Sequence, residues 1–262
     1  MTIQITIIKI EDYGPWTLKL GSDREAQLQI FQSNLYSELQ KMFSKRDAIV
    51  YFNRFDELIA ITNGLSLEGH LSIEQEINDI HKDLNISMSV GTAETPLDAN
   101  IAAYQSRKNN NLLDKSRLIY ANDQVRSIYN NSNKLSSELF AQIIHLDIDN
   151  STKVSNILSP YEITTRIMKM LSSLIELFIE QKSMTFFLGG DNFMVISNTL
   201  TKDKISLIIS KIYESQNIKL NCGIGTAATG RKAVQAATEA LDTIRSLRDQ
   251  GITQPMFEIK WI

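Results

Sequence analysis

Apolar and polar positions along the chain alternate in short strand-like runs that are separated by longer helix-like segments. The first ten residues, MTIQITIIKI, are too polar and too alternating for a signal peptide, and they predict a strand. From Ile167 to Ile179, apolar residues recur at helical spacing and are interrupted by Lys169 and Glu176. This pattern predicts a helix that packs on a core and argues against a membrane span.

Three segments of the first half recur in the second half, which indicates a duplicated chain. The matches place Asp56 on Asp191 at an offset of 135, Gly91 on Gly225 at 134 and Lys9 on Asp147 at 138. The matched segments are YFNRFDELIAITNG (51–64) with FFLGGDNFMVISNT (186–199), VGTAETPLDA (90–99) with IGTAATGRKA (224–233), and ITIIKIED (5–12) with QIIHLDIDN (142–150).

The first long helix of each copy is expected to begin with a capping box, Ser22 with Glu25 and Ser159 with Glu162. Each copy then predicts a strand, a helix, a hairpin, a helix, a strand, a helix and a final strand. In the second copy we expect these elements at 140–148, 160–181, 184–188 with 193–198, 201–216, 218–225, 231–249 and 255–261.

This element order predicts an α+β fold made of two duplicated, ferredoxin-like βαββαβ domains, each with an antiparallel sheet and helices packed on it. Segment 105–135 contains two asparagine clusters, which are typical of exposed turns. We therefore place the domain boundary near residue 130, with one domain at 1–130 and the other at 131–262.

The composition narrows the class of protein. The chain has 262 residues, and 43% of them are hydrophobic, which is enough for a substantial core. A formal net charge of −3 offers no basic surface for nucleic acid. The single cysteine, Cys222, excludes an internal disulfide and favours a reducing compartment. We expect a cytoplasmic protein that binds neither nucleic acid nor membrane.

The three histidines and the cysteine are scattered and offer no tetrahedral zinc set. His70 and His81 are expected on a surface helix, exposed to solvent. His145 precedes Asp147 by two positions and is expected on the same face of its strand. There it is either a structural group or a support for the acid.

Two acids are expected to converge in the second copy. In a βαββαβ sheet the first strand lies beside the hairpin, so the end of strand 140–148 comes close to the tip that carries Asp191. Asp147 and Asp149 alternate with Ile148 and therefore point to one face. Carboxylates as near as Asp147 and Asp191 repel each other unless a cation lies between them. Such all-oxygen ligands suit Mg²⁺, which binds together with substrate phosphates.

The glycines of the hairpin fit the same interpretation, because Gly189 and Gly190 let a phosphate-bearing ligand approach the backbone. Taken singly, a GGDN tip is typical of an ordinary hairpin turn, and an aspartate that ends a strand is typical of a cap. Together, at the two places that a metal site requires, they favour function. In the first copy Lys9 replaces Asp147 and the hairpin has no glycine pair, so we expect that copy to lack the metal site.

The motifs HLDIDN, GGDNF and GIGTAA…ALDTIR resemble those of the palm-type nucleotidyl cyclases, above all the diguanylate cyclase (GGDEF) family. The tandem arrangement, with IKIEDYGPWT, RFDELIAITNG and SVGTAET in the first copy, is similar to the archaeal GTP cyclohydrolase III family over nearly the whole length. The similarity is weakest over 105–138.

The resemblance to the palm domains implies that Asp147, the Ile148 carbonyl and Asp191 hold two Mg²⁺ ions. It implies that the phosphates are bound by Arg245 and by the turn formed by Asp149, Asn150, Ser151 and Thr152. The usual Phe–Lys pair of that turn is replaced here by Ser151 and Thr152, and Asn192 stands where the cyclases have Glu. Because an amide both donates and accepts hydrogen bonds, Asn192 is our candidate for the guanine edge.

The resemblance to GTP cyclohydrolase III implies Mg²⁺-dependent opening of the guanine imidazole ring of GTP, with loss of two phosphates. The product is 2-amino-5-formylamino-6-ribosylamino-4(3H)-pyrimidinone 5′-monophosphate, an early step toward riboflavin-type and deazaflavin cofactors. It also implies activation by K⁺ or another monovalent cation, and we expect a homo-oligomer. If the two copies pack as palm cyclase domains do, Arg54, Asp56 and Tyr13 complete the pocket.

Two other functions remain open for a chain with these motifs. One is a nucleotide or dinucleotide cyclase that acts on GTP, which would leave the purine intact. The other is a non-catalytic GTP sensor with degenerate palm domains. Retention of both Asp147 and Asp191 argues against the sensor.

Overall fold

The computed structural model describes residues 2–110, 118–120, 139–149, 157–198 and 200–261. Internal contacts divide the chain into two units. The N-terminal unit comprises Met1–Ala93, Asp98–Leu139 and Thr229–Arg231, and the C-terminal unit comprises Glu94–Leu97, Phe140–Ala228 and Lys232–Ile262. The predicted boundary near residue 130 lies outside the described residues.

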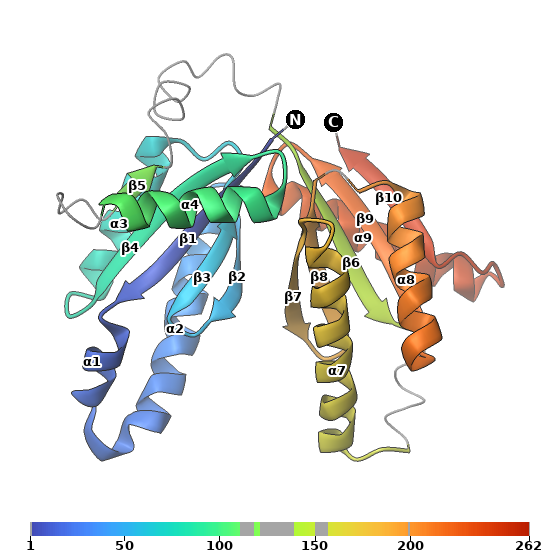
Figure 1. The fold of residues 1–262 in the computed structure, drawn as a ribbon, viewed down its shortest axis with the longest axis horizontal. Helices are drawn as coiled ribbons and strands as arrows, with labels where there is room; N and C mark the ends of the chain where they lie inside the picture. Colours follow the sequence, from blue (N-terminus) through green and yellow to red (C-terminus); the bar gives the residue numbers. More distant parts are fainter. Residues whose placement is uncertain (1, 111–117, 121–138, 150–156, 199, 262) are drawn as a thin grey trace. The chain divides into compact units, whose positions relative to one another are not determined.

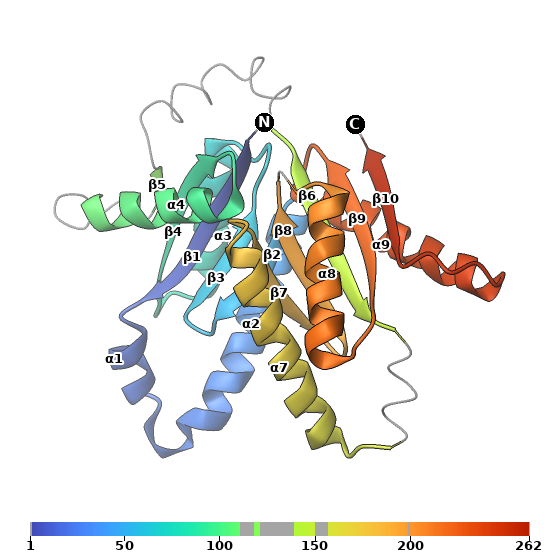
Figure 2. The same ribbon diagram turned by 45° about the vertical axis from the view of Figure 1, so that its right-hand side comes forward.

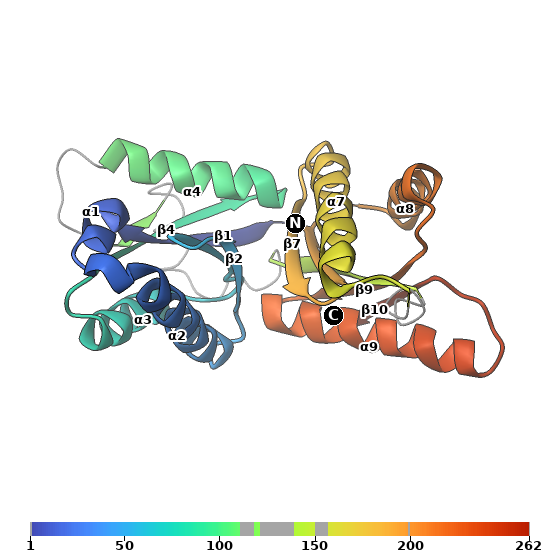
Figure 3. The ribbon, with the colours of Figure 1, turned by 90° about the horizontal axis from the view of Figure 1, so that it is seen from below.

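The N-terminal unit contains a sheet with the strand order β2-β3-β1-β4-β5. Helices α2 and α3 cover one face of this sheet, and α4 covers the other (Figure 3). The elements are β1 (Ile3–Glu11), α1 (Tyr13–Leu18), the short 3₁₀ turn η1 (Gly21–Asp23), α2 (Arg24–Ser44), β2 (Ile49–Arg54), β3 (Glu57–Ile61), α3 (Leu67–Ile80), β4 (Asn85–Ala93), α4 (Pro96–Asn110) and β5 (Leu118–Tyr120).

The C-terminal unit repeats this plan, with the strand order β10-β9-β6-β8-β7 (Figure 1). Helices α7 and α8 run side by side across one face of its sheet, and α9 lies on the opposite face (Figures 2 and 3). The elements are β6 (Ala141–Ile148), α7 (Pro160–Ile179), β7 (Met184–Gly189), β8 (Asn192–Ser197), α8 (Lys202–Gln216), β9 (Leu220–Ala227), α9 (Gly230–Asp249) and β10 (Met256–Trp261).

Strand pairing confirms both the predicted fold and the duplication. In each unit the first strand is antiparallel to its two neighbours, as a βαββαβ sheet requires, and a fifth strand adds in parallel. Ile5 pairs with Ile61 and Gly91 in one sheet. Ile143 pairs with Ile196 and Gly225 in the other. These equivalent positions reproduce the three offsets found in the sequence.

Strand β6 sends alternate side chains to two different environments. Ile144 and Leu146 are buried in a core formed with α7 and α8. His145 and Asp147 point to the other face, which α9 covers. Helix α9 approaches closely there because β9 has glycine at the contact: a Cβ on Gly225 would lie 2.2 Å from the Ala233 carbonyl oxygen.

The capping prediction is confirmed in one copy and is wrong in the other. Ser159 accepts from the Glu162 backbone at 3.4 Å while Glu162 accepts from the Ser159 backbone at 2.8 Å, which completes a capping box at the start of α7. In the first copy Gly21–Asp23 forms the turn η1, and α2 begins after Asp23 without a side-chain cap. Ser22 therefore lies inside that turn and does not cap α2.

The expectation that His70 and His81 are solvated is also wrong. His70 is fully buried, with Nε2 2.9 Å from the Thr6 hydroxyl and Nδ1 2.9 Å from the Ser66 carbonyl. Burial lowers the pKa of His70 to about 4. His81 follows the last residue of α3 and is bound through Nε2 to Glu38 at 2.6 Å. The sequence pattern missed both because each histidine is paired through tertiary contacts.

Among the helices of the described residues, none is both long enough and apolar enough to cross a lipid bilayer. Helix α7, the most apolar candidate in the sequence, instead buries Ile167, Met170, Leu174 and Phe178 against its own sheet. The prediction of a core-facing helix is confirmed.

Gly225→Ala is expected to destabilise the protein by about 1–3 kcal/mol, because the added methyl overlaps the backbone of α9. Gly91→Ala should act similarly, since its Cβ would lie 2.2 Å from the Ala99 carbonyl oxygen. Urea unfolding measures the free energy of unfolding of each variant. The control is Ala228→Ser at an exposed position, which should stay within about 0.5 kcal/mol of the parent. Equal midpoints for Gly225→Ala and the control would contradict the close-packing argument.

Stability is expected to fall on acidification because His70 must be neutral in the folded state. Its contribution is complete above pH 6.5 and is lost as the pH falls toward about 4, since the unfolded chain binds the proton first. The slope from this group reaches roughly 1.4 kcal/mol per pH unit. Urea unfolding between pH 7.5 and 4.5 measures it. His70→Gln should flatten the profile, and an unchanged slope would show that other groups cause it.

Candidate functional site

Two carboxylates lie close together at one end of the second sheet. Asp147 is the penultimate residue of β6 and pairs in register with Asn192, the first residue of β8. Asp191 occupies the turn immediately before it. Asp147 is only 8% exposed. Its burial and the nearby negative charge of Asp191 raise the pKa of the Asp147 carboxyl group, while Arg245 acts in the opposite direction.

The hairpin tip has an unusual backbone that explains its two glycines. Gly189 has φ 109° and Gly190 has φ 61°, and the β7–β8 register shifts between Phe187 and Gly189. Residues that carry a side chain rarely adopt such left-handed backbone conformations. A Cβ on Gly189 would meet nothing within 4 Å. Glycine is therefore required by the turn and not by protein packing, and space beside the turn is open to a ligand.

Helix α9 brings two guanidinium groups to the acids. Arg245 lies with Nη2 3.4 Å from the Asp147 carboxylate and Nη1 3.0 Å from Asp242. Arg248, three residues later on the same helix, pairs with Asp149 at 3.0 Å. Arg245 was predicted from the sequence, whereas Arg248 was not. Arg248 could have been predicted from its spacing, because residues three positions apart on a helix lie on the same face.

A chain of hydrogen bonds supports Asp191 from within the protein. The amide nitrogen of Asn192 donates to Asp191 at 2.9 Å, and its oxygen lies 3.1 Å from His145 Nε2. His145 Nδ1 lies 3.4 Å from the Thr238 hydroxyl. Burial lowers the pKa of His145, and because the Asn192 oxygen can only accept, Nε2 is the nitrogen that donates to it. His145 thus orients Asn192, and Asn192 orients Asp191.

These contacts bear on the role predicted for Asn192. Both ends of its amide already have partners in the protein, so a positioning role agrees better with the geometry than a contact to the guanine edge. The guanine assignment remains a prediction. Asn150, Ser151 and Thr152, predicted to bind phosphates, lie outside the described residues, whereas Asp149 is described and paired.

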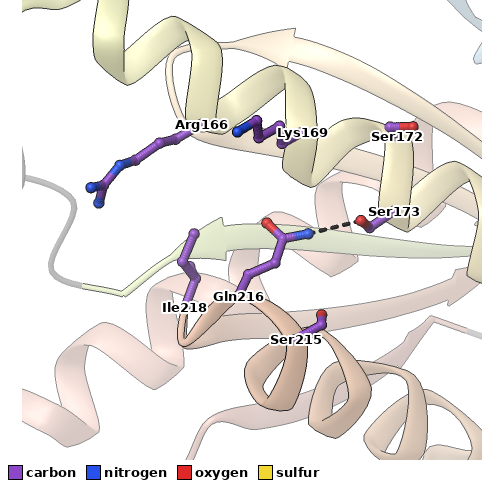
Figure 4. A pocket seen from close by; sticks show the side chains of 7 residues that line it. All are labelled: Arg166, Lys169, Ser172, Ser173, Ser215, Gln216 and Ile218. Atoms are coloured by element: carbon purple, nitrogen blue, oxygen red, sulfur yellow. Dashed lines mark hydrogen bonds between the residues drawn. The ribbon is translucent and has the colours of Figure 1, made fainter.

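A cavity of about 390 Å³ lies beside Asp191 and Asp149. Ile148, Asp149 and Asp191 line it together with residues of α7, of α8 and of the connection between α8 and β9. An adjoining cavity of about 630 Å³ shares Arg166, Gln216 and Ile218 with it and continues between the two helices (Figure 4). Both volumes fall within the range of about 300–1,000 Å³ that is typical of small-molecule sites.

The walls of these cavities were missed by sequence reasoning. The first is lined on its helical side by Ile163, Arg166, Ile167, Tyr213, Gln216, Asn217, Ile218 and Lys219. These residues belong to two helices and a connection far apart in the sequence, and none falls in a recognisable motif. Only the packing of α7 beside α8 brings them together.

The equivalent end of the N-terminal sheet is occupied by ion pairs. Lys9 pairs in register with Glu57, which stands at the position of Asn192. Arg54 takes the place of Gly189 and lies 3.4 Å from Asp56 and 3.3 Å from Glu57. Arg107 adds a contact of 3.6 Å to Glu57. The acids of this copy are paired with the protein's own cations, and the absence of a metal site there remains a prediction.

Tyr13 has a structural contact in the same unit. Its hydroxyl accepts a hydrogen bond from Gln32 at 2.6 Å, and its ring packs with Trp16 at 5.9 Å. Tyr13 and Trp16 of the YGPWT motif are partly buried and pack against the N-terminal core. A contribution of Tyr13, Arg54 or Asp56 to the pocket remains a prediction.

The donors at the C-terminal site fit a magnesium ion. No group of three or more Asp, Glu, His or Cys side chains suited to a metal occurs in the part of the chain that the structure describes. Mg²⁺ does not need one, because it binds through one or two carboxylates together with substrate phosphates and water. Asp147 and Asp191 supply the carboxylates, and their mutual repulsion favours a cation between them. Ile148 lines the cavity beside Asp191, and the role of its carbonyl as a metal ligand remains a prediction.

Comparison with known proteins gives a consistent result. The family model described as GTP cyclohydrolase III matches residues 3–256. The GTP cyclohydrolase III of Methanothermobacter thermautotrophicus is 36% identical over 244 residues, which covers 93% of this chain and 94% of that protein. The enzyme of the same name from Methanocaldococcus jannaschii is 35% identical, covering 93% of this chain and 88% of that protein.

Solved structures show only distant likeness. The GGDEF domain of DgcB from Caulobacter crescentus, in complex with c-di-GMP, aligns with a TM-score of 0.40 and 14% identity, covering 52% of this chain and 86% of that one. A bacterial light-regulated adenylyl cyclase aligns with a TM-score of 0.36 and 12% identity, covering 94% of this chain and 84% of that one.

The mutual influence of the two acids can be measured directly. In the absence of divalent ions, Asp191→Asn should lower the pKa of Asp147, because it removes a nearby negative charge. Arg245→Ala should raise it. Carboxyl-carbon NMR on aspartate-labelled protein follows both shifts. Asp56→Asn, in the other copy, is the control and should leave the Asp147 titration unchanged. If the Asp147 titration were unchanged in Asp191→Asn, the two carboxylates would not influence each other.

Proposed function

The chain belongs to the GTP cyclohydrolase III family, and we propose that its C-terminal copy is the unit that binds and hydrolyses GTP. In the reaction, water adds to C8 of guanine and the C8–N9 bond breaks, so that the formyl group stays on N7. Hydrolysis of the triphosphate releases two phosphates. The product is 2-amino-5-formylamino-6-ribosylamino-4(3H)-pyrimidinone 5′-monophosphate.

The observation that carries the placement is that Asp191, whose charge acts on Asp147, lines a cavity of about 390 Å³. A nucleoside triphosphate needs a polar, cation-binding end for its phosphates and an enclosed end for its base. The acids and the open glycine turn provide the first, and the cavity between α7 and α8 provides the second. In the N-terminal copy, the acids at the equivalent place, Asp56 and Glu57, are paired with Arg54 instead.

Two Mg²⁺ ions would be held by Asp147, the Ile148 carbonyl and Asp191. When bound, Mg²⁺ supplies neutralisation of phosphate charge and lowers the pKa of water near it. Arg245 and Arg248 lie beside Asp147 and Asp149 and can exchange these partners for phosphate oxygens. Asn192 orients the Asp191 carboxylate through a hydrogen bond, and His145 in turn orients Asn192. K⁺ activation and a homo-oligomer belong to the same proposal.

The base would lie between helices α7 and α8 in this cavity. Its aliphatic wall of Ile163, Ile167 and Ile218 suits the faces of a purine, and Arg166 and Gln216 suit its polar edge. With the base and triphosphate both held, the guanine ring has a defined orientation toward the acids. Such positioning lowers the entropic part of the barrier to hydrolysis.

The test is incubation of the purified protein with GTP and Mg²⁺, with products identified by mass and ultraviolet absorbance. Ring opening removes the purine spectrum and adds water. A cyclase would instead release pyrophosphate and keep the spectrum, and that outcome would overturn the proposal. Asp147→Asn and Asp191→Asn should reduce kcat at least about a hundredfold, because charge stabilisation at such sites is worth several kcal/mol.

Asp56→Asn is the matched control, since Asp56 is the duplicated counterpart of Asp191. Its Mg²⁺ dependence should remain that of the parent protein. Equal loss of activity in Asp56→Asn and Asp191→Asn would contradict the division between a copy that acts on GTP and a copy that does not.

A further inference from the structure

Helix α7 carries a row of exposed apolar side chains beside its buried face. The row consists of Met168, Ile175 and Ile179, which are 41%, 40% and 47% exposed. Each of them directly follows a residue that is buried in the core, in the order Ile167, Leu174 and Phe178. Because a helix turns by about 100° per residue, the exposed row lies along one side of α7, next to the face that packs on the sheet.

The edge of the sheet adds an aromatic ring to this apolar row. Strand β7 is the edge strand of the C-terminal sheet and lies beside α7. Its Phe187 pairs in register with Phe193, which belongs to the core under α7, so both rings lie on the face that α7 covers. Phe187 is 38% exposed. We call the four exposed residues Met168, Ile175, Ile179 and Phe187 the α7 surface.

The duplicated N-terminal unit shows that the fold does not require this row. The buried positions of the two helices correspond at an offset of 135, so that those of α7, Met170, Leu174 and Phe178, match Leu35, Leu39 and Phe43 of α2. At the same offset, the three positions of the exposed row are polar in α2, namely Ser33, Gln40 and Ser44. A helix in this place therefore needs no apolar row. Exposed apolar side chains gathered on one side mark a contact surface.

Two residues of opposite charge flank the row. Lys169 and Glu176 each follow a residue of the row by one position and are seven positions apart, so they lie on the same flank of α7. Among the described residues neither forms a salt bridge, and Glu176 accepts a hydrogen bond of 3.3 Å from the neighbouring Ser172. A flank with one charge of each sign complements itself when a second α7 lies against it in the opposite direction. A lipid surface would instead favour basic residues along the flank.

We propose that two copies of this chain associate through the α7 surface, with their α7 helices antiparallel about a twofold axis near Ser172. This residue lies close to the middle of both pairs, so the axis sets Met168 against the partner's Ile175 and Lys169 against the partner's Glu176. Each contact then occurs twice, as twofold symmetry requires. The small Ser172 side chain allows the two helix axes to approach to the usual distance of about 8–10 Å.

The proposed function includes a homo-oligomer, and this inference rests on that part of it alone, because it names the surface that forms the oligomer. Neither Met168 nor Ile175 lines the cavity that is assigned to the base. The contact between copies therefore stands apart from the chemistry of GTP.

Sedimentation velocity over a concentration series tests the association. The parent should sediment as a dimer or as an assembly of dimers. Met168→Lys should raise the dimer dissociation constant at least about a hundredfold, because the twofold axis places the added charge in the contact twice. Ser33→Lys is the matched control, since Ser33 is the exposed counterpart of Met168 in α2, and it should leave the association unchanged. A parent that is monomeric at every concentration, or an oligomer that is unchanged in Met168→Lys, overturns the proposal.

Exchange of the two charges tests the direction of the helices and the identity of the partner. Lys169→Glu and Glu176→Lys, each alone, set like charges against each other and should weaken the association about tenfold. The double variant K169E/E176K restores opposite charges and should associate like the parent. An equal mixture of the two single variants should form mixed dimers, because the acidic flank of one then meets the basic flank of the other. If neither the double variant nor the mixture recovers the association, the antiparallel pairing of α7 is wrong.

Failure of this inference is separable from failure of the proposed function. A monomeric parent that opens the guanine ring of GTP leaves the proposed reaction in place and removes the α7 contact. A parent that associates through α7 but leaves GTP unchanged keeps the contact and removes the reaction.

Discussion

The antiparallel pairing of β6 with β8 is the constraint on which the site depends. It sets Asp147 opposite Asn192 and therefore beside Asp191 at the hairpin tip. Side chains of a strand alternate between faces, so a slip of one residue would turn Asp147 into the core and Ile148 toward the site. The register is held because Ile144 and Leu146 are fully buried on the opposite face. Burial of aliphatic side chains thus determines where the carboxylates lie.

The two copies show how one fold tolerates opposite chemistry at the same place. Both keep the glycine that admits the last long helix, Gly91 and Gly225, because this contact is a matter of backbone distance. At the hairpin the copies differ. In the first copy Arg54 pairs with Asp56, whereas in the second copy the glycine turn leaves Asp191 open to a ligand. The packing was retained in both units, and the open acid site in one.

Much of the site followed from short sequence patterns. The acids Asp147 and Asp191 were predicted to meet because strand alternation and the βαββαβ order are local and topological rules. The pair His145–Asn192 was only partly foreseen, since strand periodicity gives the face of a side chain but not its partner. Arg248 and Gln216 were missed. Their roles arise from helices that pack on the sheet, and helix spacing alone does not show which neighbour a side chain meets.

The sequence by itself determined the duplication, the order of elements, the strand faces and the two acids, because these depend on periodicity and on motifs a few residues long. Only the tertiary structure decided the burial of His70, the internal pairing of Asn192 and the cavity between α7 and α8. Each of these depends on the distance between segments far apart in the chain. Such distances are set by the packing of whole elements, which no local pattern records.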